Sequence, residues 1–409
     1  MPVFGIGRRV RAFLHPEAGV TRNGRPNSGK DPALERELER ARAQIARQER
    51  RIERLRERLS NEKLVENQRR LPETKAPGAG TSVFFVVGQG KSGTGWLEKM
   101  LDLHPEILCR GEGRFFGRDK RNEKLIDVSA GNKFVQRKVS PSSLYNAIAE
   151  SEYLRLWIER SVWSRRKDPE EHLNNLTRLA IDYFLTSWLT ESGKRLVGDK
   201  TPFFGPEDVS EIATIHPGAK VIHIIRDGRD QAVSRMHHSW NKATDQGGVQ
   251  ELLPEEVVKR EDFYRDRQAF LDFGEGIFLE ERLREISRKW RDNVSGAIRY
   301  GRELLAENYT EVRYEDLLEK PQEEMGRLFE FLGVDTSEDV VKRCVQSASF
   351  EALAGRERGG EDYTLGWRKH RKGIAGDWKN VFTERDKEIF KEEAGDMLVE
   401  LGYEEDHDW

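Results

Sequence analysis

The sequence has few cysteines, no long apolar run and almost no net charge, and each of these absences excludes a class of protein. Its two cysteines, Cys109 and Cys344, supply neither a disulfide framework nor the ligand spacing of a metal site, and they suit a reducing compartment. No apolar stretch approaches the roughly 20 residues that cross a bilayer as a helix. A formal net charge of −3 argues against a dedicated binder of nucleic acids. We therefore expect no metal, no transmembrane segment and no nucleic-acid partner.

The amino-terminal end also lacks the apolar stretch of a secretory signal behind its arginine pair, so we predict a cytoplasmic protein. The 409 residues are enough for one large or two ordinary domains, and they contain no internal repeat. Shifts in composition predict four segments. They are a loosely ordered segment at 1–32, a coiled-coil helix at 33–70, a linker at 71–81 and a catalytic domain at 82–409.

The coiled-coil prediction depends on residues 34–59. Apolar side chains recur there at alternating spacings of four and three, which is typical of a heptad repeat and predicts a homo-oligomer through this segment. Ala41 and Gln48 occupy d positions and weaken the seam, so the number of strands stays open. A single charged helix packed on its own domain is the alternative.

Strands alternate with helices from about residue 83 onward. Apolar runs within 83–87, 195–204, 220–226 and 311–317 predict strands, and amphipathic stretches between them predict helices. This alternation indicates an α/β domain with a mainly parallel central sheet flanked by helices, in which ligands bind at the carboxyl ends of the strands.

Two segments between the strands are expected to shape a substrate site. The region 117–192 is predicted to be helical, and its aromatic residues, such as Trp157, Phe184 and Trp188, are assigned to the core. Residues 241–280 are predicted to form a polar insertion dotted with glycines. Such segments carry specificity rather than chemistry.

Three glycines, Gly88, Gly90 and Gly93, interrupt the first apolar run, and apolar residues at helical spacing follow them. Strand, glycine loop and helix form a typical cradle for phosphate, because glycines expose backbone N–H groups and a helix N-terminus carries partial positive charge. Lys91 adds a full charge. The alternative is an ordinary Gly-rich turn with one lysine.

This loop differs from that of the nucleoside triphosphatases. Their loop requires a glycine that is separated from Gly-Lys-Ser by four residues, and Phe85 stands at that position here. A P-loop kinase or nucleoside triphosphatase is therefore kept only as an alternative function. A non-enzymatic scaffold built on the coiled coil is a second alternative.

Four segments in order resemble the sulfotransferases that use 3′-phosphoadenosine 5′-phosphosulfate (PAPS). Lys91–Trp96 resembles the family's 5′-phosphosulfate loop and Arg226–Ser234 its 3′-phosphate segment, while Tyr314–Leu317 and Arg371–Trp378 resemble two later family elements. The resemblance covers roughly residues 83–380 and implies PAPS as the donor substrate, with no metal. It implies donor contacts from Gly90, Lys91, Ser92, Gly93, Thr94, Gly95, Trp96, Arg226, Ser234, Tyr314, Arg371, Lys372 and Gly373.

The chemistry of PAPS agrees with this assignment. The donor carries a phosphosulfate at one end and a 3′-phosphate at the other, so it needs two separate anion sites. Lys91 would serve the first site, and the planar guanidinium of Arg226 suits the phosphate at the second. Adenine lies between the two ends, and Trp96 and Tyr314 match the family positions that contact the base.

The resemblance also implies three catalytic residues. Lys91 would stabilise the leaving phosphate oxygen, and Lys200 resembles a lysine that some glycan sulfotransferases direct at the same centre. The Lys-x-Pro-His segment that supplies the base in the small-molecule branch is absent. Glu112, within Gly111–Phe116, resembles the glutamate that serves as the base in the glycan branch, and a turn carboxylate is the alternative interpretation. His104 is the second candidate for the base.

The acceptor is indicated only by the pattern around Glu112. This pattern favours a hydroxyl group on a glycan, a glycolipid or a glycosylated metabolite, with an amine as the alternative acceptor group. The sequence therefore predicts in-line transfer of a sulfuryl group from PAPS, assisted by a carboxylate base.

Overall fold

The computed structural model describes residues 82–117, 124–130, 133–139, 143–164, 168–202, 205–245, 252–359 and 371–409. The predicted segments 1–32, 33–70 and 71–81 lie outside these residues, and so does the predicted coiled coil. All described residues belong to one unit of the chain, residues 65–409.

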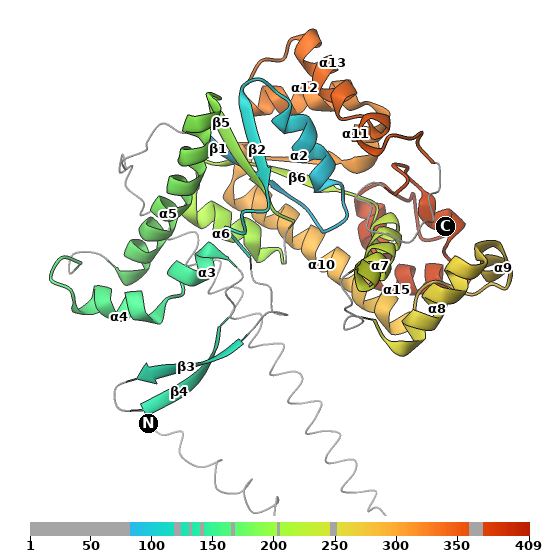
Figure 1. Ribbon diagram of the computed structural model, residues 1–409, viewed down its shortest axis with the longest axis horizontal. Coiled ribbons are helices and arrows are strands. Elements are labelled where there is room, and N and C mark those ends of the chain that lie inside the picture. The colour runs from blue at the N-terminus through green and yellow to red at the C-terminus, as the bar shows by residue number, and fades with distance from the viewer. Residues whose placement is uncertain are drawn as a thin grey trace, which may run out of the picture. The chain divides into compact units, whose positions relative to one another are not determined.

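Five parallel strands form the central sheet, in the order β2-β5-β1-β6-β7 (Figure 1). Strand β1 lies in the middle, where Phe85 is opposite Asp199 of β5. The predicted α/β fold with a mainly parallel sheet is confirmed. The strands are β1 (Ser82–Val87), β2 (Ile107–Gly111), β5 (Leu196–Lys200), β6 (Lys220–Ile225) and β7 (Tyr309–Arg313).

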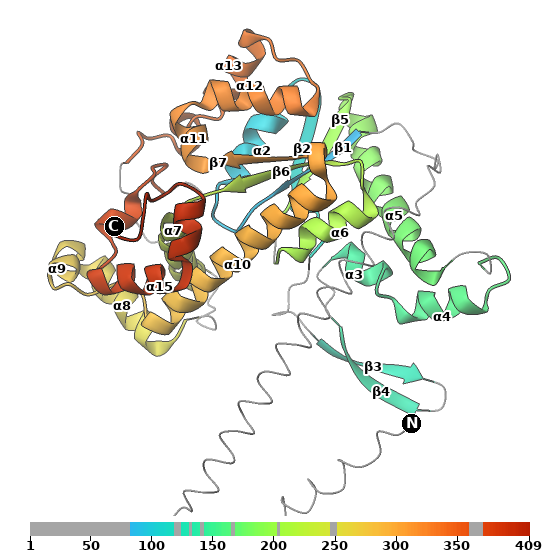
Figure 2. The same cartoon turned by 180° about the vertical axis from the view of Figure 1, so that it is seen from behind.

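Helices cover both faces of the sheet. Successive side chains of β1 point to opposite faces, so the strand packs against helices on both sides. Phe84 and Val86 pack against α2, α12 and α13 on one face, and Phe85 and Val87 pack against α5, α6 and α10 on the other (Figure 1, and from behind in Figure 2). A strand buried on both faces has to be apolar at every position, as this run is. The helices are α2 (Thr94–Asp102), α5 (Pro169–Ser192), α6 (Glu207–Ile215), α10 (Glu280–Leu304), α12 (Pro321–Leu332) and α13 (Glu338–Ser347).

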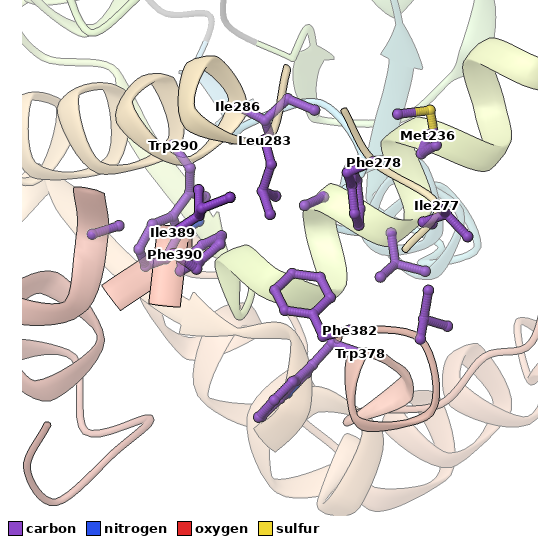
Figure 3. Close-up of a cluster of buried hydrophobic side chains, with 14 of the residues drawn as sticks. Met236, Ile277, Phe278, Leu283, Ile286, Trp290, Trp378, Phe382, Ile389 and Phe390 are labelled. Atoms are coloured by element: carbon purple, nitrogen blue, oxygen red, sulfur yellow. The ribbon is translucent and has the colours of Figure 1, made fainter. Parts of the chain in front are cut away.

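A third apolar cluster joins α10 to α7 (Gly228–Asp245) and α15 (Glu384–Glu400), as Figure 3 shows. Trp290 of α10 packs on Phe390 of α15, with their ring centroids 6.0 Å apart. The indole N–H of Trp290 also donates a hydrogen bond to the Arg226 carbonyl at 3.1 Å. The cluster therefore supports the turn between β6 and α7, which carries Arg226.

The helical prediction for residues 117–192 is wrong at its start. Strands β3 (Lys124–Ala130) and β4 (Lys133–Val139) pair there as an antiparallel hairpin. Residues 131 and 132 between them are Gly and Asn, and this pair flanked by alternating apolar residues is a hairpin signal that the analysis missed. The later part of the prediction is confirmed by three helices, α3 (Leu144–Ile148), α4 (Glu152–Arg160) and α5.

The remaining segments are more regular than the sequence suggested. Residues 241–280, predicted as a polar insertion, include two helices, and β2, which the sequence analysis did not predict as a strand, forms one edge of the sheet. The other elements are α8 (Pro254–Arg265), α9 (Arg267–Asp272), α11 (Tyr314–Glu319), α14 (Phe350–Ala354) and the 3₁₀ turns η4 (Ala306–Asn308) and η5 (Asp377–Asn380).

The assignment of the aromatic residues of α4 and α5 to the core is also wrong for most of them. Trp157, Phe184 and Trp188 are 61%, 48% and 59% exposed, whereas Ile158 and Ile181 are buried. The reason is geometric, since only one stripe of each helix faces a neighbouring element, and the aromatic residues lie outside that stripe.

Close packing between β1 and β5 predicts the effect of one substitution. Gly198 of β5 is buried, and a Cβ atom at this position would overlap the ring of Phe84 on β1. We expect Gly198→Ala to lower the free energy of unfolding by about 1–3 kcal/mol, because overpacking displaces the ring. Urea denaturation monitored by tryptophan fluorescence measures this change.

The matched control is Gly326→Ala on α12, where an added Cβ would meet no atom within 4 Å. Alanine should raise the free energy of unfolding there by about 0.5–1 kcal/mol, because glycine is unfavourable inside a helix. Equal effects of the two substitutions would contradict the packing described for Gly198.

Candidate active site

Each strand of the sheet ends at, or just before, a residue or loop that the sequence analysis predicts to belong to the site. Strand β1 leads into the glycine loop, β2 into Glu112, β6 into Arg226 and β7 into Tyr314, while β5 ends at Lys200. Parallel strands bring their carboxyl ends to the same edge of a sheet, and the order of these strands reverses beside β1. A cavity of about 1570 Å³ lies at this edge.

Nearly all of the predicted site residues line this cavity. Ser92 is the exception among them, because it is buried within the loop, where its N–H donates to the Gln89 carbonyl at 3.0 Å. The hydroxyl of Ser92 has no hydrogen-bond partner in the described part of the chain. The predicted residues that line the cavity are Gly90, Lys91, Gly93, Thr94, Gly95, Trp96, Glu112, Lys200, Arg226, Ser234, Tyr314, Arg371, Lys372 and Gly373.

The glycine loop turns sharply into α2. Gly93 immediately precedes this helix with φ 97°, a left-handed conformation that favours glycine, and a Cβ there would lie 2.5 Å from Tyr314 Cδ2. The first turn of α2 carries no acidic side chain, so its N-terminal N–H groups face the cavity without a local carboxylate. On the other side of the loop, the Gln231 amide donates to the Gly90 carbonyl at 2.6 Å. The loop is thus held on both sides, with the N-terminus of α2 directly after it.

Lys91 lies in an environment that already carries positive charge. Burial, together with the nearby guanidinium groups of Arg226 and Arg371, lowers its pKa from 10.5 to about 8, against the opposing effect of Glu112. Arg226 also donates to the Lys91 carbonyl at 3.2 Å. Loss of water contacts is the larger cause, and the two arginines add to it.

Arg226 connects the glycine loop to the C-terminal segment. Its guanidinium is buried, and its central carbon lies 4.4 Å from the centre of the Tyr314 ring. The guanidinium also donates to the Ile374 carbonyl at 3.3 Å. Asp230, one turn later on α7, lies 3.7 Å from the guanidinium and accepts from the N–H groups of Gly376 and Trp378 at 2.7 and 2.9 Å. One buried carboxylate therefore holds both the arginine and the C-terminal segment in place.

Arg371 and Lys372 share the carboxylate of Asp377. Arg371 forms a hydrogen-bonded ion pair with it, and the Lys372 ammonium donates to Asp377 Oδ1 at 2.7 Å. Burial raises the pKa of Asp377, but the two cations outweigh this effect and hold that pKa well below its usual range. Gly373 follows with φ 65°, and a Cβ there would overlap the Phe350 ring. Ser234 reaches the same end of the cavity from α7.

Aromatic side chains line the same cavity as these cations. The rings of Trp96 and Tyr314 meet edge to face with their centroids 5.7 Å apart, and the Trp96 indole N–H donates to the Ala348 carbonyl at 2.7 Å. Leu318 and Phe350 line the cavity beside them. This arrangement suits a flat ring with polar edges.

Lys200 lies between two carboxylates at the end of β5. Its ammonium nitrogen is 3.3 Å from Glu112 Oε1 and 3.3 Å from Glu98 Oε2. The Lys200 side chain is 8% exposed, whereas the Glu112 side chain is 51% exposed and so can reach a molecule in the cavity. Glu98, on α2, was not predicted from the sequence, although its place one turn after Thr94 puts it on the helix face that follows the loop.

Asp199 is a second acidic residue that the sequence analysis missed. It is buried beside Lys200, and burial raises its pKa to about 6, against the effect of hydrogen bonds from Thr201 and Gly113. The sequence did contain a signal for Asp199, because a carboxylate within an apolar strand is costly to bury unless it has a specific partner.

His104, the second candidate for the base, does not line the cavity. It is fully buried, with Nε2 2.9 Å from the Asp335 carbonyl, Nδ1 accepting from the Glu106 N–H at 3.1 Å, and its ring packed on Phe329. His237 and His238 of α7 do line the cavity. Burial and the nearby charge of Arg371 hold the pKa of His237 well below its usual value.

The described residues contain neither a metal-binding group of side chains nor a helix suited to cross a membrane. Within them, no three His, Cys, Asp or Glu side chains are grouped so that they could hold a metal ion. None of the helices described there combines the length and apolar character that a membrane crossing requires.

The fold and the cavity define an α/β protein with a glycine loop and a second cationic cluster at the carboxyl edge of its sheet. Residues 82–400 match the family model of the sulfotransferase domain. The chain therefore belongs to the sulfotransferase family.

Individual relatives are more distant. Sulfotransferase 1 family member D1 of Rattus norvegicus is 27% identical over 184 residues, which cover 42% of this chain and 53% of the relative. The Mus musculus protein of the same name is 33% identical over 89 residues, covering 20% of this chain and 30% of the relative. The chain thus spans about half or less of the length of these relatives. A solved mouse sulfotransferase complexed with PAP has 16% identity and a TM-score of 0.41, covering 79% of this chain and 88% of that one.

The charge around Lys91 predicts how its amine titrates. An ordinary lysine amine loses its proton near pH 10.5, whereas a pKa of about 8 means that Lys91 is half deprotonated already near pH 8. Competitive labelling with a trace acylating reagent across pH 6–11, read by mass spectrometry, should give this lower midpoint. Arg226→Met should raise the midpoint, because a charge that disfavours the ammonium is removed.

Arg302→Met is the matched control. Arg302 is an exposed residue of α10 that pairs with Glu311, so its loss should leave the Lys91 midpoint unchanged. A wild-type midpoint near 10.5, or one that Arg226→Met does not move, would contradict the electrostatics described here.

Proposed function

We propose that the protein is a PAPS-dependent sulfotransferase that transfers a sulfuryl group to a hydroxyl group of a glycan, a glycolipid or a glycosylated metabolite. The observation that carries this proposal is one cavity lined by the glycine loop with Lys91, by the cations Arg226, Arg371 and Lys372, and by the rings of Trp96 and Tyr314. A nucleotide with an anion at both ends and a flat base in the middle has the complementary pattern.

The balance of charge supports an anionic donor. Near the C-terminal segment, Arg226 lies 3.7 Å from Asp230, while Arg371 and Lys372 share the single carboxylate of Asp377. Lys91 adds a cation at the glycine loop. A bound phosphate and phosphosulfate would neutralise this excess, and charge-assisted hydrogen bonds to them are stronger than neutral ones.

The same geometry supports in-line transfer. The acceptor oxygen would attack the sulfur, the bond from sulfur to the bridging phosphate oxygen would break, and Glu112 would take the proton of the acceptor hydroxyl. Lys91 would stabilise the charge that develops on the leaving phosphate oxygen. Lys200, which lines the cavity and contacts Glu112 at 3.3 Å, would act at the same centre as Lys91.

The polar wall of the cavity favours a sugar as the acceptor. Beyond the donor residues, the wall carries many charged or hydroxyl-bearing side chains, among them Arg114, Glu150, Thr201 and Glu207. Such groups hydrogen-bond hydroxyls, whereas a phenol or sterol would require an apolar wall. An amine is the alternative acceptor group. A screen of oligosaccharide, glycolipid, phenol and amine acceptors with ³⁵S-labelled PAPS tests this order.

Loss of the proposed base gives the first test. Glu112→Gln keeps the size of the side chain but cannot take a proton, so we expect kcat to fall by about 10²–10⁴-fold. The affinity for 3′,5′-diphosphoadenosine, measured by calorimetry, should stay within about twofold. Glu307→Gln, an exposed substitution in η4, should leave both quantities unchanged. A rate near that of the wild type in Glu112→Gln would exclude Glu112 as the base.

Donor recognition gives the second test. Lys91→Ala and Arg226→Ala should each weaken binding of 3′,5′-diphosphoadenosine about tenfold or more, since each removes a charged partner of a phosphate. The wild type should bind this nucleotide more tightly than ATP, and magnesium should not reverse the order. Tighter binding of ATP with magnesium would favour a P-loop kinase or nucleoside triphosphatase instead, and no nucleotide binding at all would favour a scaffold.

We also propose that residues 34–59 join copies of the chain and that residues 82–409 form the catalytic domain. The heptad pattern supports the first statement. Deleting residues 1–70 should reduce the mass measured by light scattering to that of a smaller assembly, and an unchanged number of chains would argue against the coiled coil. Cys109 and Cys344 are both free and buried, which supports a reducing, cytoplasmic location.

A further inference from the structure

The loop that carries Glu112 is attached to the end of β5 by a buried carboxylate. Asp199 is 4% exposed. Its Oδ1 accepts from the backbone N–H of Gly113 at 2.8 Å, and its Oδ2 accepts from the Thr201 hydroxyl at 2.7 Å. Each oxygen of Asp199 therefore accepts one hydrogen bond, and together the two bonds fix the orientation of the carboxylate. One of the two donors is the backbone N–H of Gly113, the residue directly after Glu112.

Lys200 contacts the same loop on the other side. Consecutive residues of a strand point to opposite faces, so Asp199 and Lys200 approach the loop from different directions. Gly111 of β2 is the register partner of Lys200, which brings the end of β2 beside the end of β5. Asp199 thus holds the backbone just after Glu112, while the Lys200 ammonium contacts the Glu112 carboxylate at 3.3 Å.

The glycines on either side of Glu112 have a steric explanation in this arrangement. A Cβ on Gly111 would lie 2.5 Å from Lys200 Cε, and a Cβ on Gly113 would lie 2.6 Å from Phe115 Cε2 and 2.7 Å from Asp199 Oδ1. A larger residue at Gly111 would crowd the Lys200 side chain, and one at Gly113 would crowd both Asp199 and the Phe115 ring. The Gly-Glu-Gly sequence is therefore what the close approach of the last two residues of β5 requires.

We propose that Asp199 is a positioning residue that fixes the carboxylate of Glu112 for proton transfer. The proposal rests on the proposed function, in which Glu112 is the base. The ion pair with Lys200 cannot fix Glu112 alone, because its glutamate partner is 51% exposed and exposed ion pairs are weak. A buried hydrogen bond from a backbone N–H to a carboxylate is stronger and has a defined geometry.

The test compares two substitutions of Asp199. Asp199→Ala leaves the Gly113 N–H without its acceptor, and we expect kcat to fall about 100-fold, because a shift of about 1 Å in a catalytic group costs that much. Donor KM and the affinity for 3′,5′-diphosphoadenosine should change by less than about twofold. Asp199→Asn can still accept from Gly113 through its carbonyl oxygen and donate to Thr201 through its amide, so it should restore kcat to within about tenfold of the wild type.

Two results would overturn the proposal. If Asp199→Ala turns over at the wild-type rate, Asp199 does not position the base. If Asp199→Asn is as slow as Asp199→Ala, the negative charge or a proton on Asp199 is needed, and the role is not one of positioning. Failure of the proposed function is seen separately, as wild-type turnover in Glu112→Gln or as absence of binding to 3′,5′-diphosphoadenosine.

A second substitution decides the question if Asp199→Ala does not fold. Gly113→Ala keeps the Asp199 carboxylate but pushes the loop away from it, so kcat should fall in the same way while donor affinity is kept. Gly218→Ala is the matched control, because an added Cβ at this exposed turn meets no atom within 4 Å, and it should have the wild-type rate. A wild-type rate in Gly113→Ala would overturn the proposal.

Discussion

The common direction of the five strands is the constraint on which the site depends. Parallel strands place all their carboxyl ends at one edge, and here each end leads to or carries a residue that faces the same cavity. A reversed strand would move its terminal residue to the opposite edge of the sheet. The packing of β1 between β5 and β6 therefore decides whether the glycine loop, Lys200 and Arg226 meet at all.

The second requirement is that positive charge is held in a buried space. Arg226 is almost fully buried, and the pKa of Lys91 is lowered to about 8 by burial and by its cationic neighbours. Asp230 offsets part of this charge and at the same time binds two backbone N–H groups of the C-terminal segment. The same hydrogen bonds fix Asp230 against the C-terminal segment, so the carboxylate that faces Arg226 is held in one place.

The parts of the site that were predicted are those with local signals. Glycines followed by a helix indicate an anion cradle whatever the rest of the fold is, and Lys91 lies within that cradle. Arg226 and Tyr314 were placed by short segments that resemble those of the family, and each of the two residues directly follows a strand of the sheet. The hairpin β3–β4 also had a local signal, but it was missed because the neighbouring segments are strongly helical.

The sequence by itself determined the alternation of strands β1, β5, β6 and β7 with helices, the glycine loop with Lys91, and the resemblance to the sulfotransferases, because these depend on residues close together in the chain. Only the tertiary structure decided which carboxylates approach Lys200, that Asp199 holds the loop of Glu112, and that His104 lies away from the cavity. Lys200 and Glu112 are separated by 88 positions, and their contact follows from the register between β2 and β5. Such a register is set by the packing of whole strands and helices, which no short stretch of sequence encodes.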